Sequence, residues 1–342
     1  MDLSALTLTQ LRYLLAIDES GSFRAAAQIC SVSQPALSAQ LQKLEELLGV
    51  RIFDRTRKPI VKTEAGQRII PQARLIVQEV ERLATLANHG ADAVAGRFRL
   101  GIIPTIASNL LPRFVPAFCA NYPDVELVIE EHPTSALLER LSQDRLDAGI
   151  AATPLSAPGI AEQPLFREPF YAYMPLGHPL LQTSAVEEGQ LAGEPLWLLA
   201  EGHCFRDQVL RLCGAHRPVC TPEGATLTFE GGTFATLIGL VEAGWGLTVI
   251  PELTLAGLPA EQRRLHARPF AAPVPAREVS LIRARPYLRR NIADRLAETI
   301  VTQVARTLGP RGKLEYVLPP IPGEALCTNA SLAPQRPTST AR

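Results

Sequence analysis

Two cysteines lie nine residues apart in residues 202–213, a segment with the sequence Gly-His-Cys-Phe-Arg-Asp-Gln-Val-Leu-Arg-Leu-Cys. His203 precedes Cys204 and a guanidinium follows closely, and nearby cations convert a thiol into the more reactive thiolate. Asp207 can cap a short helix with an apolar face, so we expect Cys204 just before the helix N-terminus, where the helix dipole also favours a thiolate. Cys204 is therefore a candidate reactive cysteine.

The spacing of Cys204 and Cys213 sets a condition on any bond between them. If the segment is helical throughout, nine residues separate the two Cα atoms by roughly 13 to 14 Å, whereas a disulfide needs them within about 7 Å. A bridge would therefore require the helix to unwind, and the reduced and oxidised forms could not share one packing. The alternative is that both thiols are inert core residues, because cysteine is among the most buried residue types.

The whole segment closely resembles the redox segment of the OxyR-type peroxide sensors, which are LysR-type transcriptional regulators. Gly202-His203-Cys204, the run Arg-Asp-Gln that follows and Cys213 all stand at matching positions. The resemblance implies that Cys204 is the peroxidatic cysteine, which reacts with hydrogen peroxide, and that Cys213 is the resolving cysteine, which converts the product to a disulfide.

The composition describes a chain of 342 residues with formal net charge zero, which is long enough for two or three domains. The chain as a whole has no excess of basic residues that would indicate nucleic-acid binding, so any such excess must be confined to one region. Six cysteines, no signal peptide and no apolar run long enough to span a bilayer indicate the reducing cytoplasm. There a disulfide is more often a transient signal than a permanent crosslink.

The first 62 residues predict a helix-turn-helix. Apolar residues at helical spacing indicate helices over residues 7–19, 22–29 and 33–48, with Ser22 and Ser33 as caps and Gly49 as a stop. The short turn between the second and third helices suits insertion of the third into a major groove. Between Ser22 and Lys62, seven Lys or Arg residues stand against three Asp or Glu residues. Positive charge therefore gathers where DNA is expected.

Several short motifs of this region resemble the winged helix-turn-helix of the LysR family over about 65 residues: Ser22-Phe23-Arg24-Ala25-Ala26-Ala27, Ser33-Gln34-Pro35-Ala36-Leu37-Ser38, Leu44-Glu45, Leu48-Gly49 and Phe53-Asp54-Arg55. The resemblance implies that the start of the third helix contacts double-stranded promoter DNA and that the wing contacts phosphates or the minor groove. The expected contacts on the third helix are Ser33, Gln34, Pro35 and Ser38, and those on the wing are Arg55, Arg57 and Lys58.

Residues 63–96 predict a long helix followed by a hinge. Apolar residues recur at helical spacing from about residue 69 to residue 86, and an apolar seam without a domain of its own to cover suggests pairing with a second copy. Pro71 is expected to kink or break this helix. By resemblance the chain forms a dimer and, beyond it, a tetramer.

Residues 97–308 alternate between strand and helix patterns, which is typical of an α/β sheet covered on both faces. We expect strands at 98–103, 125–131, 148–152, 170–174, 196–199, 247–250 and 279–283, and helices at 110–121 and 135–143. The resemblance adds a regulatory domain of periplasmic-binding-protein type. Its first subdomain comprises about 97–165 and 270–308 and its second about 166–269, with crossovers near residues 165 and 270. Residues 309–342 are proline-rich and are expected to be disordered, without an assigned role.

A binding site is expected where strand ends meet helix N-termini. Thr105 and Thr134 follow the first two strands of this domain, although threonine there is more often only a helix cap. By resemblance, Thr105, Thr134, His203 and Arg285 bind peroxide beside the reactive cysteine.

Three alternatives compete with a peroxide-sensing activator of oxidative-stress genes. The first is a LysR-type regulator that answers to a small metabolite in the cleft between the subdomains. The second is an enzyme with Cys204 as nucleophile and His203 as base, but adjacent residues rarely face each other as that pairing needs. The third is a zinc site, whose spacing matches no common motif; its ligands would be Cys204, Cys213, His216 and Cys220.

We therefore predict a regulator that is not an enzyme and that needs neither cofactor nor metal. Its expected partners are promoter DNA, a second copy of the chain, RNA polymerase and a cellular thiol reductant, and no membrane.

Overall fold

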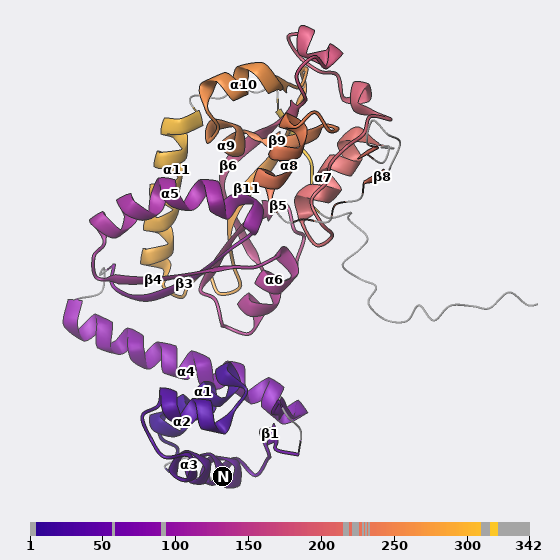
Figure 1. Cartoon of the computed structure of the whole chain (residues 1–342). Helices are drawn as coiled ribbons and strands as arrows, with labels where there is room; N and C mark the ends of the chain where they lie inside the picture. The colour runs from indigo at the N-terminus through magenta and orange to yellow at the C-terminus, as the bar shows by residue number, and fades with distance from the viewer. Residues whose placement is uncertain are drawn as a thin grey trace, which may run out of the picture. The chain divides into compact units, whose positions relative to one another are not determined.

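A computed structural model of the chain (Figure 1) describes residues 5–56, 59–89, 94–214, 219–220, 226–227, 229, 231, 233–308 and 315–320. The chain forms two compact units. The first consists chiefly of the residues up to Phe98, and the second contains most of the remainder. Among the described residues, no helix combines the length and the apolar character needed to cross a bilayer.

The N-terminal unit is a winged helix-turn-helix. Its elements are α1 (Leu8–Ser20), α2 (Phe23–Ile29), α3 (Gln34–Leu48), the antiparallel pair β1 (Phe53–Asp54) and β2 (Val61–Lys62), and α4 (Glu64–His89). Side chains of Thr7, Ser22 and Ser33 cap the three first helices, and Gly21 and Gly49 end α1 and α3 in the left-handed conformation. These local signals explain why the three predicted helices are confirmed.

The long helix α4 is continuous through Pro71, so of the kink or break expected there the break is wrong. Proline removes one hydrogen bond of the helix, but Ile70, Ala73 and Val77 on either side of it are buried in the core of this unit. This packing holds the helix together across the proline. Farther along α4, the side chains of Ile76, Val80 and Leu83 are exposed, at spacings of four and three residues. They form an apolar seam on one face of the helix.

The second unit is built on a mixed eight-stranded sheet. The strand order is β10-β6-β11-β5-β3-β4, with β12 paired to β11 and β9 paired to β6. The strands are β3 (Gly96–Ile102), β4 (Val125–Glu131), β5 (Ala148–Thr153), β6 (Ala161–Tyr173), β9 (Thr248–Pro251), β10 (Ala267–Pro269), β11 (Val274–Arg283) and β12 (Glu315–Val317). The long antiparallel strands β6 and β11 pair from Arg283↔Ala161 to Ala276↔Pro169, and the end of β6 continues into the pairing with β9 and β10.

Helices and a small hairpin complete this unit. They are α5 (Pro104–Asn121), α6 (Thr134–Ser142), α7 (Cys204–Cys213), α8 (Phe234–Glu242), α9 (Glu252–Ala256), α10 (Ala260–His266), α11 (Arg290–Leu308), the 3-10 turns η1 (Pro179–Gln182) and η2 (Glu188–Leu191), and the pair β7 (Val219–Cys220) and β8 (Thr226–Leu227). Figure 1 shows α7 beside α8 and α5 beside α11. The α/β architecture predicted for the regulatory half is confirmed.

Four predicted elements differ from the structure. Residues 196–199 are not a strand, because only an isolated bridge joins Leu196 to Leu247. The strand predicted at 170–174 is the end of β6, and the helix predicted from residue 110 begins at Pro104. The tail expected to be disordered contributes β12, so that prediction is wrong for residues 315–320. Residues 309–314 and 321–342 lie outside the described residues.

Candidate functional site

Helix α7 begins at one cysteine and ends at the other. Both thiols are free, and the exposed fractions of Cys204 and Cys213 are 7% and 2%. Asp207 lies in the first turn and His203 is the N-cap residue, without a side-chain cap bond, so the predicted cap is wrong. Nine residues of continuous helix place the two Cα atoms roughly 13 to 14 Å apart. The helix therefore holds the two thiols too far apart to form a disulfide, and a bond between them requires α7 to unwind.

Glycines border α7 at both ends. Gly202 has φ +88° and Gly214 has φ +63°, backbone angles that residues other than glycine rarely adopt. Within the helix, the Phe205 ring packs edge to face against Phe170 at 5.0 Å and against Phe234 at 5.1 Å between ring centroids. Phe205 is therefore the anchor of the first turn, and unwinding α7 must displace a fully buried aromatic side chain.

A buried ion pair lies beside the first turn of α7. Arg277 of β11 and Glu168 of β6 are 1% and 0% exposed, and Arg277 Nε donates to Glu168 Oε2 at 2.8 Å. The Arg277 guanidinium also donates to the hydroxyl and the carbonyl oxygen of Thr105, each at 3.1 Å, and lies 5.2 Å from the centre of the Phe205 ring. Glu168 Oε1 accepts from the Leu253 amide at 2.7 Å. The contacts with Glu168, Thr105 and Phe205 fix the guanidinium, whose positive charge acts on the Cys204 thiol.

The surroundings of Cys204 keep its thiol protonated at rest. Burial raises the pKa of Cys204, and the positive charge of Arg277 and the Thr134 hydroxyl reduce this rise without cancelling it. Of the neighbours in the sequence, the Phe205 amide also lowers this pKa, as expected at the start of a helix, whereas the charge of Asp207 raises it. Burial lowers the pKa of His203, which favours the neutral imidazole, and the guanidinium of Arg206 donates to the Leu199 carbonyl at 2.9 Å. The cation that acts on the thiol is Arg277, which lies 73 positions farther along the chain.

Thr105 and Thr134 converge on this site from the first turns of α5 and α6. Both side chains are buried, and Thr134 Oγ1 has no hydrogen-bond partner of ordinary geometry among the described residues, although it is close enough to the sulfur to affect the pKa of Cys204. A buried hydroxyl without a partner costs free energy unless something binds to it. The Thr134 hydroxyl and the charge of Arg277 both act on the Cys204 thiol, so these three groups are the polar groups gathered at the first turn of α7.

Arg285 is not part of this cluster. β11 runs from Val274 to Arg283, and six residues of strand place Arg283 on the order of 20 Å from Arg277. Arg285 follows that far end of the strand. The arginine expected from the Arg285-Pro286 pair is therefore corrected to Arg277. The signal for it was an arginine inside a strand that is otherwise almost wholly buried, paired with Glu168 in the neighbouring strand.

The second cysteine lies in a different setting. Burial raises the pKa of Cys213 to about 12, and the negative charge of Glu188 adds to the effect. Two ligands of the zinc alternative, His216 and the side chain of Cys220, lie outside the described residues. Within the described part of the chain, no group of three or more His, Cys, Asp or Glu side chains is arranged to hold a metal ion.

The predicted DNA contacts lie at the start of α3. Ser33 is its N-cap, with Gln34 and Pro35 exposed in the first turn, and Ser38 is half-buried one turn later. Arg55 follows β1, whereas Arg57 and Lys58 lie outside the described residues. Four of the five described candidates therefore share one end of the helix that was expected to enter the major groove.

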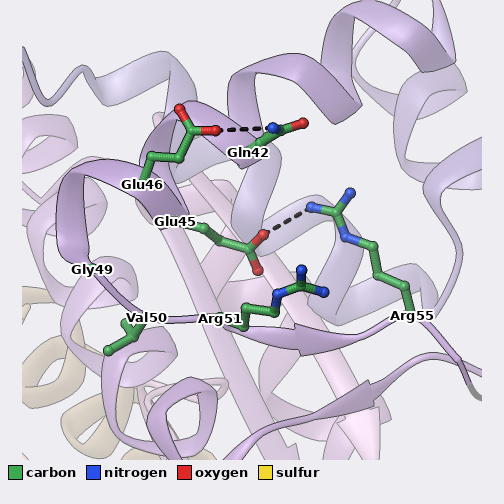
Figure 2. A pocket seen from close by; sticks show the side chains of 7 residues that line it. All are labelled: Gln42, Glu45, Glu46, Gly49, Val50, Arg51 and Arg55. Atoms are coloured by element: carbon green, nitrogen blue, oxygen red, sulfur yellow. Dashed lines mark hydrogen bonds and ion pairs between the residues drawn. The ribbon is translucent and has the colours of Figure 1, made fainter.

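A buried carboxylate ties α3 to the wing. Glu45 accepts hydrogen bonds from the amides of Ile52 (2.8 Å) and Phe53 (3.4 Å) and from Arg55 Nη2 (2.8 Å). The guanidinium of Arg55 also lies 5.1 Å from the centre of the Phe23 ring. Figure 2 shows the Glu45–Arg55 pair in a pocket lined by Gln42, Glu45, Glu46, Gly49, Val50, Arg51 and Arg55. Glu45 therefore fixes the direction of Arg55 across ten positions of the chain, a role that no local sequence motif indicates.

Known proteins resemble the chain over both units. The family model of the LysR substrate binding domain matches residues 91–305, and that of the bacterial regulatory helix-turn-helix protein, lysR family, matches residues 8–67. A hydrogen peroxide-inducible genes activator of Haemophilus influenzae is 33% identical over 305 residues, which cover 89% of this chain and 99% of the relative.

Solved structures resemble it as well. A full-length OxyR variant of Pseudomonas aeruginosa is 34% identical, with a TM-score of 0.72 and coverage of 86% of this chain and 98% of that one. A hydrogen peroxide-bound OxyR mutant of Corynebacterium glutamicum is 30% identical, with a TM-score of 0.58 and coverage of 88% and 95%.

Proposed function

The chain belongs to the LysR family of bacterial transcriptional regulators, and we propose that it is a DNA-binding activator switched by hydrogen peroxide through a reversible disulfide between Cys204 and Cys213. It is a regulator and not an enzyme. One observation carries the proposal: two buried free thiols lie at opposite ends of α7, and the charge of Arg277 and the Thr134 hydroxyl both act on the first of them. Its relatives carry names or titles that refer to hydrogen peroxide or OxyR.

The first step is the oxidation of Cys204. Peroxide suits the surroundings of the sulfur chemically, because it both donates and accepts hydrogen bonds, and the Thr134 hydroxyl and the Arg277 guanidinium both act on this thiol. The sulfur attacks one peroxide oxygen, the O–O bond breaks, and the other oxygen leaves as water after taking the thiol proton. Cys204 becomes a sulfenic acid. Arg277 stabilises the negative charge that develops on the leaving oxygen. Thr105 orients this guanidinium, and the neutral imidazole of His203, the residue before Cys204, offers one further donor.

The second step forms the disulfide. The Cys213 sulfur attacks the Cys204 sulfur, the S–O bond breaks, and the hydroxyl leaves as water with the Cys213 proton. The two sulfurs can meet only if α7 unwinds, and unwinding displaces Phe205 from its contacts with Phe170 and Phe234. The two forms of the chain therefore differ in packing around α7, as a two-state switch requires. A cellular dithiol or glutathione system in the cytoplasm reverses the reaction.

The DNA-binding unit supplies the output. Ser33, Gln34, Pro35 and Ser38 contact base edges or phosphates from the start of α3, and Arg55 contacts a phosphate from the wing with Arg57 and Lys58. The apolar seam of Ile76, Val80 and Leu83 on α4 pairs with the same seam of a second copy. A dimer, and a tetramer built from dimers, then changes its spacing on promoter DNA when α7 is remodelled, and RNA polymerase responds to that change.

The test combines chemistry with DNA binding. Peroxide-treated full-length protein is digested without reductant, and mass spectrometry is expected to find one peptide pair joined through Cys204 and Cys213. Footprinting of one promoter with reduced and oxidised protein is expected to give different protected lengths. Recovery of both thiols unmodified after peroxide treatment would reject the proposal. A Cys204→Ser variant that still responds to an inducer in cells would favour the metabolite-responsive regulator instead.

A further inference from the structure

A short segment at the end of the described chain, which we call the C-terminal strap (residues 315–320), lies against the redox helix. Its strand β12 runs parallel to β11, with Glu315 opposite Val274 and Val317 opposite Ala276. The Leu318 amide then donates to the Ala276 carbonyl at 2.9 Å. The strap is thus attached to the backbone of the strand that carries Arg277, whose side-chain hydrogen bonds are to Thr105 and Glu168.

The strap also bonds directly to α7. Gln208 Nε2 donates to the Leu318 carbonyl at 2.6 Å, and Arg211 Nη1 donates to the Pro319 carbonyl at 3.1 Å. Gln208 is fully buried, and its Oε1 has no partner among the described residues, so the bond to the strap is what compensates for burying this amide. Both donors lie between Cys204 and Cys213, inside the segment that must unwind.

A third contact links the strap to the surroundings of Cys213. The Tyr316 hydroxyl donates to Glu188 of η2, and η2 packs against α7. The charge of Glu188 contributes to the raised pKa of Cys213. The strap therefore holds in place a carboxylate that keeps the resolving thiol protonated and less reactive.

We propose that the C-terminal strap is a positioning element for the second step of the switch: it holds α7 helical and slows closure of the disulfide after Cys204 has been oxidised. The inference rests on the proposed function. The strap contributes no side chain to the cluster of Thr105, Thr134 and Arg277, so it leaves the first step unaffected. Closing the disulfide breaks the Gln208 and Arg211 bonds, because a bridge cannot form while the residues that carry them are helical. The strap thus sets how long the sulfenic acid persists.

The experiment measures the two steps separately in reduced protein treated with peroxide. Sulfenic acid at Cys204 is trapped with a dimedone-type reagent in a Cys213→Ser background, and disulfide closure is followed by mass spectrometry when Cys213 is present. A chain that ends at Leu308 lacks the strap. A matched chain that ends at Pro320 keeps it and controls for the loss of residues 321–342. In the full chain, the double variant Gln208→Met/Arg211→Met breaks the bonds to α7 without shortening the protein.

We expect disulfide closure to be about fivefold faster or more in the double variant, as for loss of one or two hydrogen bonds of ordinary net strength. The chain ending at Leu308 should close at least as fast, and the chain ending at Pro320 should match the full chain. Sulfenic acid formation should be unchanged in all of them. Tyr316→Phe should accelerate closure less, and Tyr287→Phe, on an exposed tyrosine, should have no effect.

Two results distinguish a failure of this inference about the strap from a failure of the proposed function. If sulfenic acid forms at Cys204 but closure is no faster in the double variant or in the chain ending at Leu308, the strap has no role in the switch, while the proposed function stands. If the unmodified chain forms no sulfenic acid at Cys204, the proposed function itself fails. Should the shortened chain not fold, as judged by its thermal unfolding transition, the double variant in the full chain decides the question.

Discussion

Replacing Arg277 with methionine separates the structural from the chemical role of the buried ion pair. Arg277→Met leaves the Glu168 carboxylate fully buried and without its cation, although it still accepts a hydrogen bond from the Leu253 amide. Breaking a buried pair by removing one partner costs about 3 to 5 kcal/mol. In a domain of this size, such a loss lowers Tm by roughly 6 to 20 °C. A thermal unfolding transition of the reduced protein measures this directly.

The same substitution should slow the reaction with peroxide. Arg277 lowers the pKa of Cys204 against the effect of burial, and it stabilises the oxygen that leaves. Removing one such preorganised donor reduces the rate of the chemical step by about 10² to 10³. We expect that decrease in the rate of sulfenic acid formation at Cys204, measured by stopped flow or by competition with a peroxidase of known rate.

The double variant Glu168→Gln/Arg277→Met is the matched control. It removes the buried negative charge that Arg277→Met leaves without a cation, and it keeps an acceptor for the Leu253 amide. Because replacement of both partners of a buried ion pair is often neutral, we expect most of the lost stability to return. The peroxide rate should stay low. If the rate returned together with the stability, Arg277 would only support the fold and the assignment of its chemical role would be refuted. A single Arg277→Met variant that reacts at the rate of the unmodified protein would refute it as well.

Three further predictions concern other parts of the chain. Cys213→Ser should accumulate sulfenic acid at Cys204 without a disulfide, and its footprint should stay that of reduced protein; a full switch in that variant would remove Cys213 from the mechanism. Glu45→Ala should weaken promoter binding by about tenfold in a gel-shift assay, since two amides and Arg55 lose their acceptor, while the peroxide rate stays unchanged. A thiol of the unfolded chain ionises near about pH 8.5, whereas burial raises the pKa of Cys213 in the folded chain to about 12. Between these two values the unfolded state binds fewer protons than the folded state. The free energy of unfolding, measured with urea, should therefore fall as the pH rises, by up to about 1.4 kcal/mol per pH unit for this thiol. Cys213→Ser should flatten that slope, and an identical slope in the variant would contradict the raised pKa.

Local signals explain what could be predicted from the sequence. Ser22, Ser33 and Gly49 set the ends of helices through contacts with residues a few positions away, so the helix-turn-helix was predictable from these caps and the apolar spacing. The segment that holds Cys204 and Cys213 is likewise continuous in sequence. Only its start was misplaced, because Asp207 is a good cap but the helix begins three residues earlier.

Non-local contacts explain the rest. Glu168 and Arg277 are 109 residues apart and meet only because β6 and β11 pair, so no local motif marks the arginine, and the nearby Arg285-Pro286 pair was misleading. The pKa of Cys204 follows from burial, which depends on the complete core and not on the adjacent histidine. The strap was missed for the same reason. Its proline-rich composition indicates disorder, whereas its contacts come from Gln208, 110 positions earlier.

Hydrogen exchange of the amides of α7 is the most direct test of the switch, read by mass spectrometry before and after peroxide treatment of the full chain. We expect the peptide that spans Cys204 to Cys213 to be protected in the reduced protein and to lose most of its protection once the two sulfurs are joined. A protein with the disulfide closed and the amides of this helix still fully protected would contradict the requirement that α7 unwinds.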